Sequence, residues 1–458
     1  MGKNPETVTN TGFLERYFKL SENKTNVKTE VIAGITTFLT MAYIIAVNPN
    51  FLSTTGMPIG PLVTATCLAA GLTTILMGLY GNLPFALASG MGLNAFFAFT
   101  VCGAMKIPWQ LALTAVFVEG IIFIILSLTK IRELVVNAIP NSLKIAVSAG
   151  IGLFIAFIGF QDAKIIVNDD ATLVKLGALY DPRVLIAITG IVIIGIMMHK
   201  KVRGAILWGI LICTGIAWGY ALYIGPATAA KLYGISLPAG VAKVYGIGDI
   251  FWKFDFSFTS SLKLFSEFMA IMITFLFVDF FDTVGTLVGV ASKADMFDKD
   301  GKVLRANKAL LTDAIGTTFG AMVGVSTVTT YVESAAGVSE GGRTGLTSVI
   351  TGLLFILAIF FAPIFVAVPT CATAPALVIV GLLMIQNITK IDFNDFTEGI
   401  PAFITIILMP LTYSIATGLM FGIVSYAVFN ILGGKSKKVS GTMWVLAILF
   451  IFKMIFIK

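Results

Sequence analysis

The chain has 458 residues, of which 57% are hydrophobic and 12% are charged, and its formal net charge is +7. Its mean hydropathy is +0.95. Water-soluble domains carry about a quarter charged residues, so this composition excludes a soluble fold and predicts a polytopic protein of the lipid bilayer. The positive charge lies mainly in short loops, which indicates membrane topology and contact with anionic lipids and argues against a nucleic-acid partner.

A window of about 20 residues divides the chain into about fourteen membrane segments. They lie near 29–52, 60–80, 88–102, 108–130, 142–160, 183–199, 203–224, 265–291, 306–324, 330–341, 344–365, 374–388, 396–412 and 415–432. The third and tenth are short and interrupted by glycine, so we expect broken helices there. The terminal run 443–458 contains Lys453, which favours an interfacial or bundle-packed helix over a fifteenth span.

The loop charges orient these segments. Residues 1–28 are polar and lack the apolar stretch of a cleavable signal peptide, so we expect a cytoplasmic N-terminal segment. Short basic loops then follow the even-numbered spans, including 199–203 and 292–308. By the positive-inside rule, both termini of this multi-pass chain face the cytoplasm, and the long 227–264 loop faces outward.

A faint repeat relates the two halves of the chain. Glu30–Leu39 aligns without gaps on Glu267–Leu276, with Glu, Ala, Thr, Phe and Leu in common. Because each half holds seven spans, an odd number, the halves would enter the membrane in opposite orientations. Inverted repeats of this kind place a binding site near the bilayer midplane, where broken helices meet.

Two carboxylates lie inside segments that otherwise look lipid-spanning, Asp282 in the eighth span and Glu333 in the tenth. An acid at membrane depth costs roughly 2.5–3.5 kcal/mol, so such residues usually mark a substrate or ion pathway. Asp279 lies nearly on the helical face of Asp282, either in the site or in an interhelical hydrogen bond. A carboxylate among apolar side chains can take up and release a proton, so all three acids are candidates for proton coupling. Sodium coupling stays an alternative, because nearby hydroxyl groups and unwound backbone could also supply ligands.

The broken segments supply further candidates. In the first, Pro84 forbids a regular helix, and Gly90 and Gly92 allow extended or positive-φ backbone and a close ligand approach. Asn94 is expected to open the short helix that follows. In the second, the backbone of Thr329 and Thr330 is predicted to be extended before the half-helix of Glu333. The rings of Phe96 or Phe281 could sandwich a planar ligand.

The sequence offers little for catalysis. Its single histidine is His199, and its four cysteines are scattered through apolar segments without metal-ligand spacing. An integral membrane enzyme would need a nucleophile–base pair or a metal cluster. We therefore expect no enzyme activity, no catalytic residue, no metal and no cofactor.

Several long segments resemble the AzgA-type purine nucleobase permeases, a branch of the nucleobase:cation symporters that includes the uracil and xanthine permeases. They are TTFLTMAYIIAVNPNFLSTTGMP (36–58), GNLPFALASGMGLNAFFAFTV (81–101), VDFFDTVGTLVGVASKADM (278–296), STVTTYVESAAGVSEGGRTGL (326–346) and FVAVPTCATAPALVIVGLLM (365–384). The resemblance implies proton-coupled uptake of adenine, guanine or hypoxanthine at the cell membrane, and dimerisation through the gate spans.

The resemblance also implies a division into domains and roles for three residues. Spans 1–4 and 8–11 would form a core, and spans 5–7 and 12–14 a gate. The resulting boundaries are 1–28 for the N-terminal segment, 29–226 for the first repeat (core 29–130, gate 142–224), 227–264 for the outer loop, 265–432 for the second repeat (core 265–365, gate 374–432), and 433–458 for the C-terminal segment. Asp282, Glu333 and Asn94 correspond to the polar site residues of the eighth, tenth and third spans. Where some uracil-type members carry histidine, this chain has Thr286, which excludes a proton mechanism based on that imidazole.

Two other transporters of this type stay open as alternatives, a xanthine- or uracil-type symporter and a same-fold anion exchanger. Two carboxylates facing the cavity argue against the exchanger, because an anion needs a cationic or neutral site. A passive channel would not need paired broken helices with acids.

Overall fold

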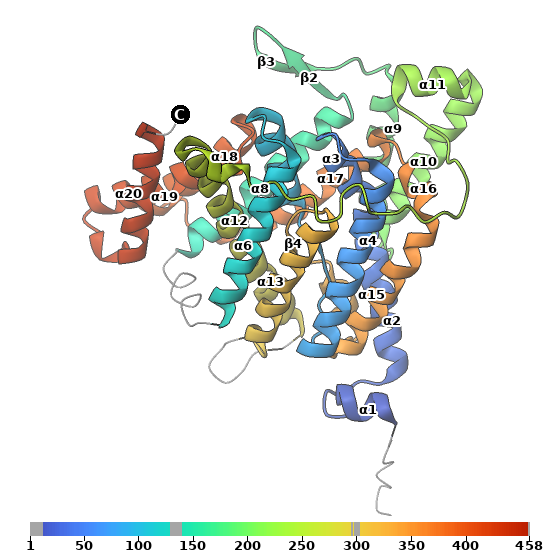
Figure 1. Cartoon of the computed structure of the whole chain (residues 1–458), viewed down its shortest axis with the longest axis horizontal. Helices are drawn as coiled ribbons and strands as arrows, with labels where there is room; N and C mark the ends of the chain where they lie inside the picture. The colour runs from blue at the N-terminus through green and yellow to red at the C-terminus, as the bar shows by residue number, and fades with distance from the viewer. Residues whose placement is uncertain (1–11, 129–139, 295, 297–302, 457–458) are drawn as a thin grey trace, which may run out of the picture.

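The computed structural model describes residues 12–128, 140–294, 296 and 303–456. Within them the chain is almost entirely helical, with two short two-stranded sheets. In Figure 1 most long helices run in a common direction, with α1 (Phe13–Phe18) at one end and the hairpin of β2 (Ile166–Asp169) and β3 (Leu173–Leu176) at the other. The all-α polytopic fold predicted from the sequence is confirmed.

Helices lie at all fourteen predicted positions. In the first half they are α2 (Val27–Met41) with α3 (Ile44–Ser53), α4 (Ile59–Leu76), α5 (Met91–Ala95) after β1 (Leu87–Ser89), α6 (Trp109–Leu128), α8 (Asn141–Asp162), α9 (Pro182–His199) and α10 (Ala205–Ile224). In the second half they are α12 (Leu262–Ala294), α13 (Ala306–Val323), α14 (Ser334–Ser339) after β4 (Val328–Thr330), α15 (Gly345–Ala358) with α16 (Ala362–Val366), α17 (Thr370–Ile385), α18 (Phe396–Leu411) and α19 (Ile415–Leu432). By length and composition, 8 helical segments of the described chain can cross a membrane unaided, and shorter apolar helices lie at Met91–Ala104, Phe396–Leu411 and Thr417–Leu432.

The packing of the helices has the symmetry expected of two repeats. Helix α2 packs on α15, and its counterpart α12 packs on α6; likewise α4 packs on α15, and α13 packs on α6. Each contact becomes the other when the first seven spans are exchanged for the second seven. Figure 1 shows α2, α4 and α15 side by side, although α15 comes from the other half of the sequence.

The helices also form two groups that pack mainly within themselves. One contains α8, α9, α10, α17, α18 and α19, and the other contains the remaining spans with β1 and β4. The ranges assigned to core and gate stay a prediction, because packing alone does not show which helices move.

Glycines let helices from the two halves approach closely. A Cβ at Gly152 on α8 would lie 2.7 Å from the carbonyl oxygen of Gly381 on α17. Gly78, just after α4, and Gly345 of α15 approach each other in the same way. Small residues at such crossings bring backbones close enough for van der Waals packing, which drives helix association in lipid.

The long connection after α10 and the C-terminal helix pack against the helices of the bundle. The segment between α10 and α12 holds α11 (Pro226–Tyr233) and a 3₁₀ turn at Ser257–Ser260, and its Trp252 backbone N–H donates to the carbonyl oxygen of Met322 at 2.8 Å. The terminal helix α20 (Gly441–Phe456) packs against α19. Asp395 precedes α18, and Lys435 follows α19. The Lys435 ammonium donates to both carboxylate oxygens of Asp395 at 2.8 and 2.7 Å, and this pairing holds the pKa of Asp395 well below its usual range.

Candidate functional site

The two broken spans meet in a short antiparallel pair of strands. Leu87 of β1 lies opposite Thr330 of β4, and Ser89 lies opposite Val328. Two more bonds extend the pair, from Gly90 N–H to the Thr327 carbonyl and from Tyr331 N–H to the Ala86 carbonyl, both at 2.9 Å. Lipid cannot satisfy peptide groups, so the pairing explains how extended backbone is tolerated at this depth. The sequence predicted both extended segments but not that they bind each other.

Gly90 is needed because the opposite strand comes close. Its backbone is extended (φ −67°, ψ 122°) and does not have the positive φ that the sequence allowed, and it precedes α5 as the N-cap. A Cβ there would lie 2.8 Å from the Thr329 Cγ2. The helix therefore begins at Met91, three residues earlier than the expected start at Asn94.

Asn94 is fully buried and holds the two broken spans together. Its Oδ1 accepts from the Ser89 hydroxyl at 2.8 Å and from the Ser326 hydroxyl, and its Nδ2 donates to the Ser89 carbonyl at 3.4 Å. The Tyr331 hydroxyl donates to the same carbonyl at 2.5 Å. In this conformation the Asn94 amide is thus occupied by protein partners.

A second buried network fixes β4 against α12 and α13. The Thr283 hydroxyl donates to Asp313 Oδ2 at 2.8 Å and lies 2.9 Å from the Thr329 hydroxyl. The Thr330 N–H donates to Asp313 Oδ1 at 3.1 Å. Polar groups of Thr329 and Thr330 therefore form hydrogen bonds with residues of α12 and α13. Asp313 is a structural partner for threonine and backbone groups.

Asp282 and Glu333 are both half-buried, and they come from two different spans of the second repeat. Asp282 lies on α12, and Glu333 lies in the turn between β4 and α14, one residue before that helix instead of within it. The two carboxylates are close enough to interact electrostatically. Asp279, by contrast, is fully buried and faces α13, where the Thr317 hydroxyl lies 3.4 Å from it.

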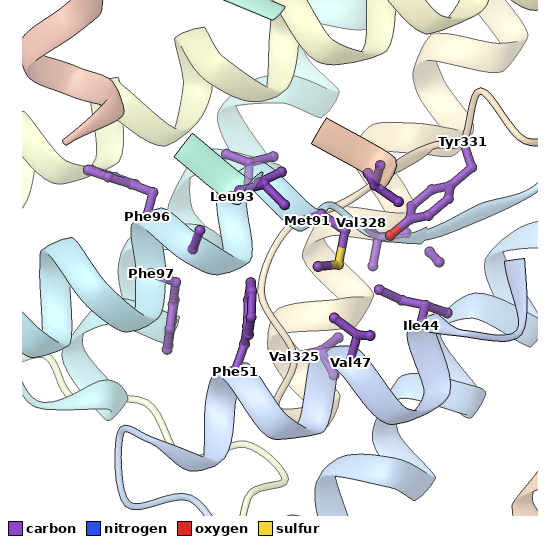
Figure 2. Packing of buried hydrophobic residues seen from close by; sticks show 14 of the residues in the cluster. Ile44, Val47, Phe51, Met91, Leu93, Phe96, Phe97, Val325, Val328 and Tyr331 are labelled. Carbon is purple, nitrogen blue, oxygen red and sulfur yellow. The ribbon is translucent and has the colours of Figure 1, made fainter. Parts of the chain in front are cut away.

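Of the aromatic and glycine candidates, Phe96 and Gly92 are packed against other helices. Phe96 is buried and meets the Phe275 ring edge-on at 4.9 Å between centroids. The side chain of Phe281 lies outside the described residues. A Cβ at Gly92 would lie 2.5 Å from the Cγ2 of Ile151 on α8, so this glycine faces a helix of the other group. Figure 2 shows buried apolar side chains of α3, of the first half-helix and of the segment around β4 packed together.

Two tyrosines at the site were missed by the sequence reasoning. The Tyr43 hydroxyl donates to Glu333 Oε1 at 2.8 Å, and Tyr331 interacts electrostatically with both Glu333 and Asp282. Tyr331 lies two residues before the acid, which is a usable signal. Tyr43 lies far away in sequence, and only its polar tip within an apolar span pointed to a partner.

The arrangement suits a ligand with N–H donors. Two half-buried carboxylates offer several acceptor positions, and each can accept two N–H groups in a fork. Within the described part of the chain, no group of three or more His, Cys, Asp or Glu side chains could hold a metal ion.

Comparison with known proteins shows the family to which the chain belongs. Residues 28–421 match the Xan_ur_permease model, which describes a permease family. A putative permease of Methanocaldococcus jannaschii is 48% identical, over 97% of this chain and 99% of that protein. The adenine permease AdeP of Escherichia coli is 42% identical over 97% of both chains. The guanine/hypoxanthine permease PbuG of Bacillus subtilis is 42% identical, over 97% of this chain and 100% of its own.

Among solved structures, the transmembrane domain of the cyanobacterial bicarbonate transporter BicA is similar in fold. Its TM-score is 0.62 with 16% identity, over 86% of this chain and 97% of that domain. The fold is thus that of a known class of transporters, and the resemblance to AzgA-type permeases read from the sequence is confirmed. The chain belongs to the permease family that includes these adenine and guanine/hypoxanthine permeases.

Proposed function

We propose that this permease is a secondary active transporter that imports purine nucleobases, namely adenine, guanine or hypoxanthine, together with protons. The observation that carries the proposal is the half-buried pair Asp282 and Glu333 at the meeting point of the two broken spans. The names of its relatives support a purine substrate.

A purine base is planar and neutral, and it carries N–H donors and lone-pair acceptors on its edges. Glu333 or Asp282 would accept edge N–H groups, because a charge-assisted hydrogen bond is roughly twice as strong as a neutral one. The first-turn N–H groups of α5 would donate to the ring acceptors. The ring of Phe96 or Phe281 would need to turn toward the base to stack on it.

Proton coupling is supported by the nearness of the two acids. Two ionised carboxylates in an apolar setting repel each other, and a proton taken up from outside removes that repulsion. Release of the proton inside would leave both carboxylates ionised again. Asp279, three residues from Asp282 on α12, could relay the proton.

Alternating access would follow from movement of the core past the gate. The strand pair links the half-helices of the two repeats, so the core would carry the base as one unit. Spans 1–4 and 8–11 would form this core, spans 5–7 and 12–14 the gate, and gate helices would mediate dimerisation. Both termini would face the cytoplasm.

The test is uptake by purified protein in proteoliposomes. An inward proton gradient without sodium should drive accumulation of labelled adenine or hypoxanthine, and a protonophore should abolish it. Accumulation that follows a sodium gradient at equal pH and ignores the protonophore would refute proton coupling. Competition by unlabelled adenine, guanine, hypoxanthine, xanthine and uracil would identify the substrate and expose a xanthine- or uracil-type symporter.

An anion exchanger is the second candidate, because BicA shares the fold. Carboxylates at the site disfavour it, since a bound anion would meet like charge. Bicarbonate or chloride counterflow without purine uptake, in the same vesicles, would overturn the purine proposal in its favour.

A further inference from the structure

Tyr43 lies where the first span is interrupted. Helix α2 ends at Met41 and α3 begins at Ile44, and the N–H groups of Ile45 and Ala46 bond three residues back instead of four. The Tyr43 side chain is 1% exposed, so its hydroxyl needs a partner inside the protein. That partner is Glu333 Oε1 at 2.8 Å.

The bond has two consequences for the carboxylate. A hydrogen bond to an ionised group is strong and directional, so it fixes the orientation of the Glu333 side chain. A carboxylate offers about four acceptor positions, and one hydroxyl donor occupies only one of them. Among the described residues no other side-chain hydrogen bond to this carboxylate is found, which leaves positions for the edge of a base.

Tyr43 also lies at the boundary with the other group of helices. It helps to line an apolar cavity of about 380 Å³ between the first span, α10 and the α15–α16 segment, together with Thr214 and Trp218 of α10. Tyr43 therefore contacts Glu333 through its hydroxyl and lies at the boundary between the two groups of helices.

We infer that Tyr43 is a positioning residue for substrate binding, which acts by holding the Glu333 carboxylate in the orientation that accepts the N–H groups of the base. This inference rests on the proposed function. A purine bound at the site would contact Glu333. Tyr43 would act through that acid without touching the base.

The decisive variant is Tyr43→Phe, which removes the hydroxyl and keeps the aromatic ring. A lost hydrogen bond to a charged group corresponds to a rise of roughly 10- to 100-fold in KM for purine uptake. The matched control is Tyr426→Phe, because the Tyr426 hydroxyl also donates to a glutamate, Glu398 Oε1 at 3.3 Å, among the gate helices. It should leave KM within about twofold of wild type.

A second variant covers the case in which Tyr43→Phe does not reach the membrane. Glu333→Asp keeps the charge but withdraws it by one methylene from the hydroxyl, and it should raise KM to a similar extent. In the double mutant Tyr43→Phe/Glu333→Asp, KM should rise little further, because both changes break the same bond. The amount of each variant in the membrane is measured by immunoblot. Its thermal midpoint is measured in detergent.

The outcomes separate this inference from the proposed function. Wild-type KM in either Tyr43→Phe or Glu333→Asp overturns the positioning role while leaving purine transport intact. A lower thermal midpoint with unchanged KM in Tyr43→Phe shows a purely structural role and overturns it as well. Absence of purine uptake by the wild-type protein refutes the proposed function instead.

Discussion

Replacement of Gly92 by alanine tests how closely the two groups of helices approach each other. The added methyl would lie 2.5 Å from the Ile151 Cγ2. Carbon atoms in good contact are about 3.5–4.0 Å apart, so a helix or a side chain must move by about 1 Å. Overpacking of this kind costs about 1–3 kcal/mol, which lowers the population of the conformation in which α5 touches α8 by roughly 5- to 150-fold.

Because a transporter must pass through each of its conformations in every cycle, the initial rate of purine uptake should fall by a factor in that range. The assay is uptake of labelled base by cells without their own permeases, at equal membrane levels of each variant. Gly219→Ala is the matched control, because nothing lies within 4 Å of a Cβ at that position on α10, and it should transport at the wild-type rate.

The double mutant Gly92→Ala/Ile151→Ala distinguishes helix packing from ligand contact. It lacks the Cγ2 that the new methyl would strike, so its rate should match that of Ile151→Ala alone. A wild-type rate in Gly92→Ala would refute the packing argument. A raised KM that Ile151→Ala does not relieve would instead show that Gly92 faces the ligand, as the sequence suggested.

Three further predictions concern the acids, the topology and the pH dependence. Asp282→Asn and Glu333→Gln should each abolish concentrative purine uptake at near-normal membrane level; near-normal uptake by either, measured with labelled base, would remove that residue from the site. A cysteine at Asn168, which is exposed on the β2–β3 hairpin, should react with an impermeant thiol reagent added outside the cell. A cysteine at Lys299, which lies outside the described residues, should react only after permeabilisation. The reverse labelling pattern would show that the orientation is inverted. Because its lysine partner depresses the pKa of Asp395, the stabilisation is present above the unfolded value of about 3.9 and is lost as the pH falls through the folded value. Thermal denaturation of Asp395→Asn should therefore show a deficit against wild type that is constant between about pH 5 and 8 and shrinks below about pH 4, whereas a deficit that grows in acid would contradict the pairing.

The spans could be predicted from the sequence because the signals that define them are local. Lipid demands long apolar runs, and capping residues in the sequence mark where the helices begin. The span expected at 183–199 is the helix Pro182–His199, with Asp181 accepting from the Arg183 N–H as N-cap and proline in the first turn. The break in the third span followed in the same way from Pro84 and the glycines near it.

The site could be predicted only in part, because its contacts join distant segments. Asp282 and Glu333 stood out by their cost in lipid, which is a property of a single residue. That Asn94 would be held by Ser89 and Ser326, or that Tyr43 would bind Glu333, depends on pairings across most of the chain. Gly92 shows the same limit, since a glycine in a broken span fits a nearby ligand and a nearby helix equally well.

The strand pair that builds the site also sets a schedule for its assembly. About 240 residues separate Leu87 from its partner Thr330. At a synthesis rate of roughly 5–20 residues per second, β1 is made about 12–50 s before β4 exists. During that interval its peptide groups have no strand partner, and exposed backbone of this kind is costly in lipid. Until then the first broken span must lie in water, in the insertion machinery or against its own half of the protein, and the strand pair cannot form before β4 has been made.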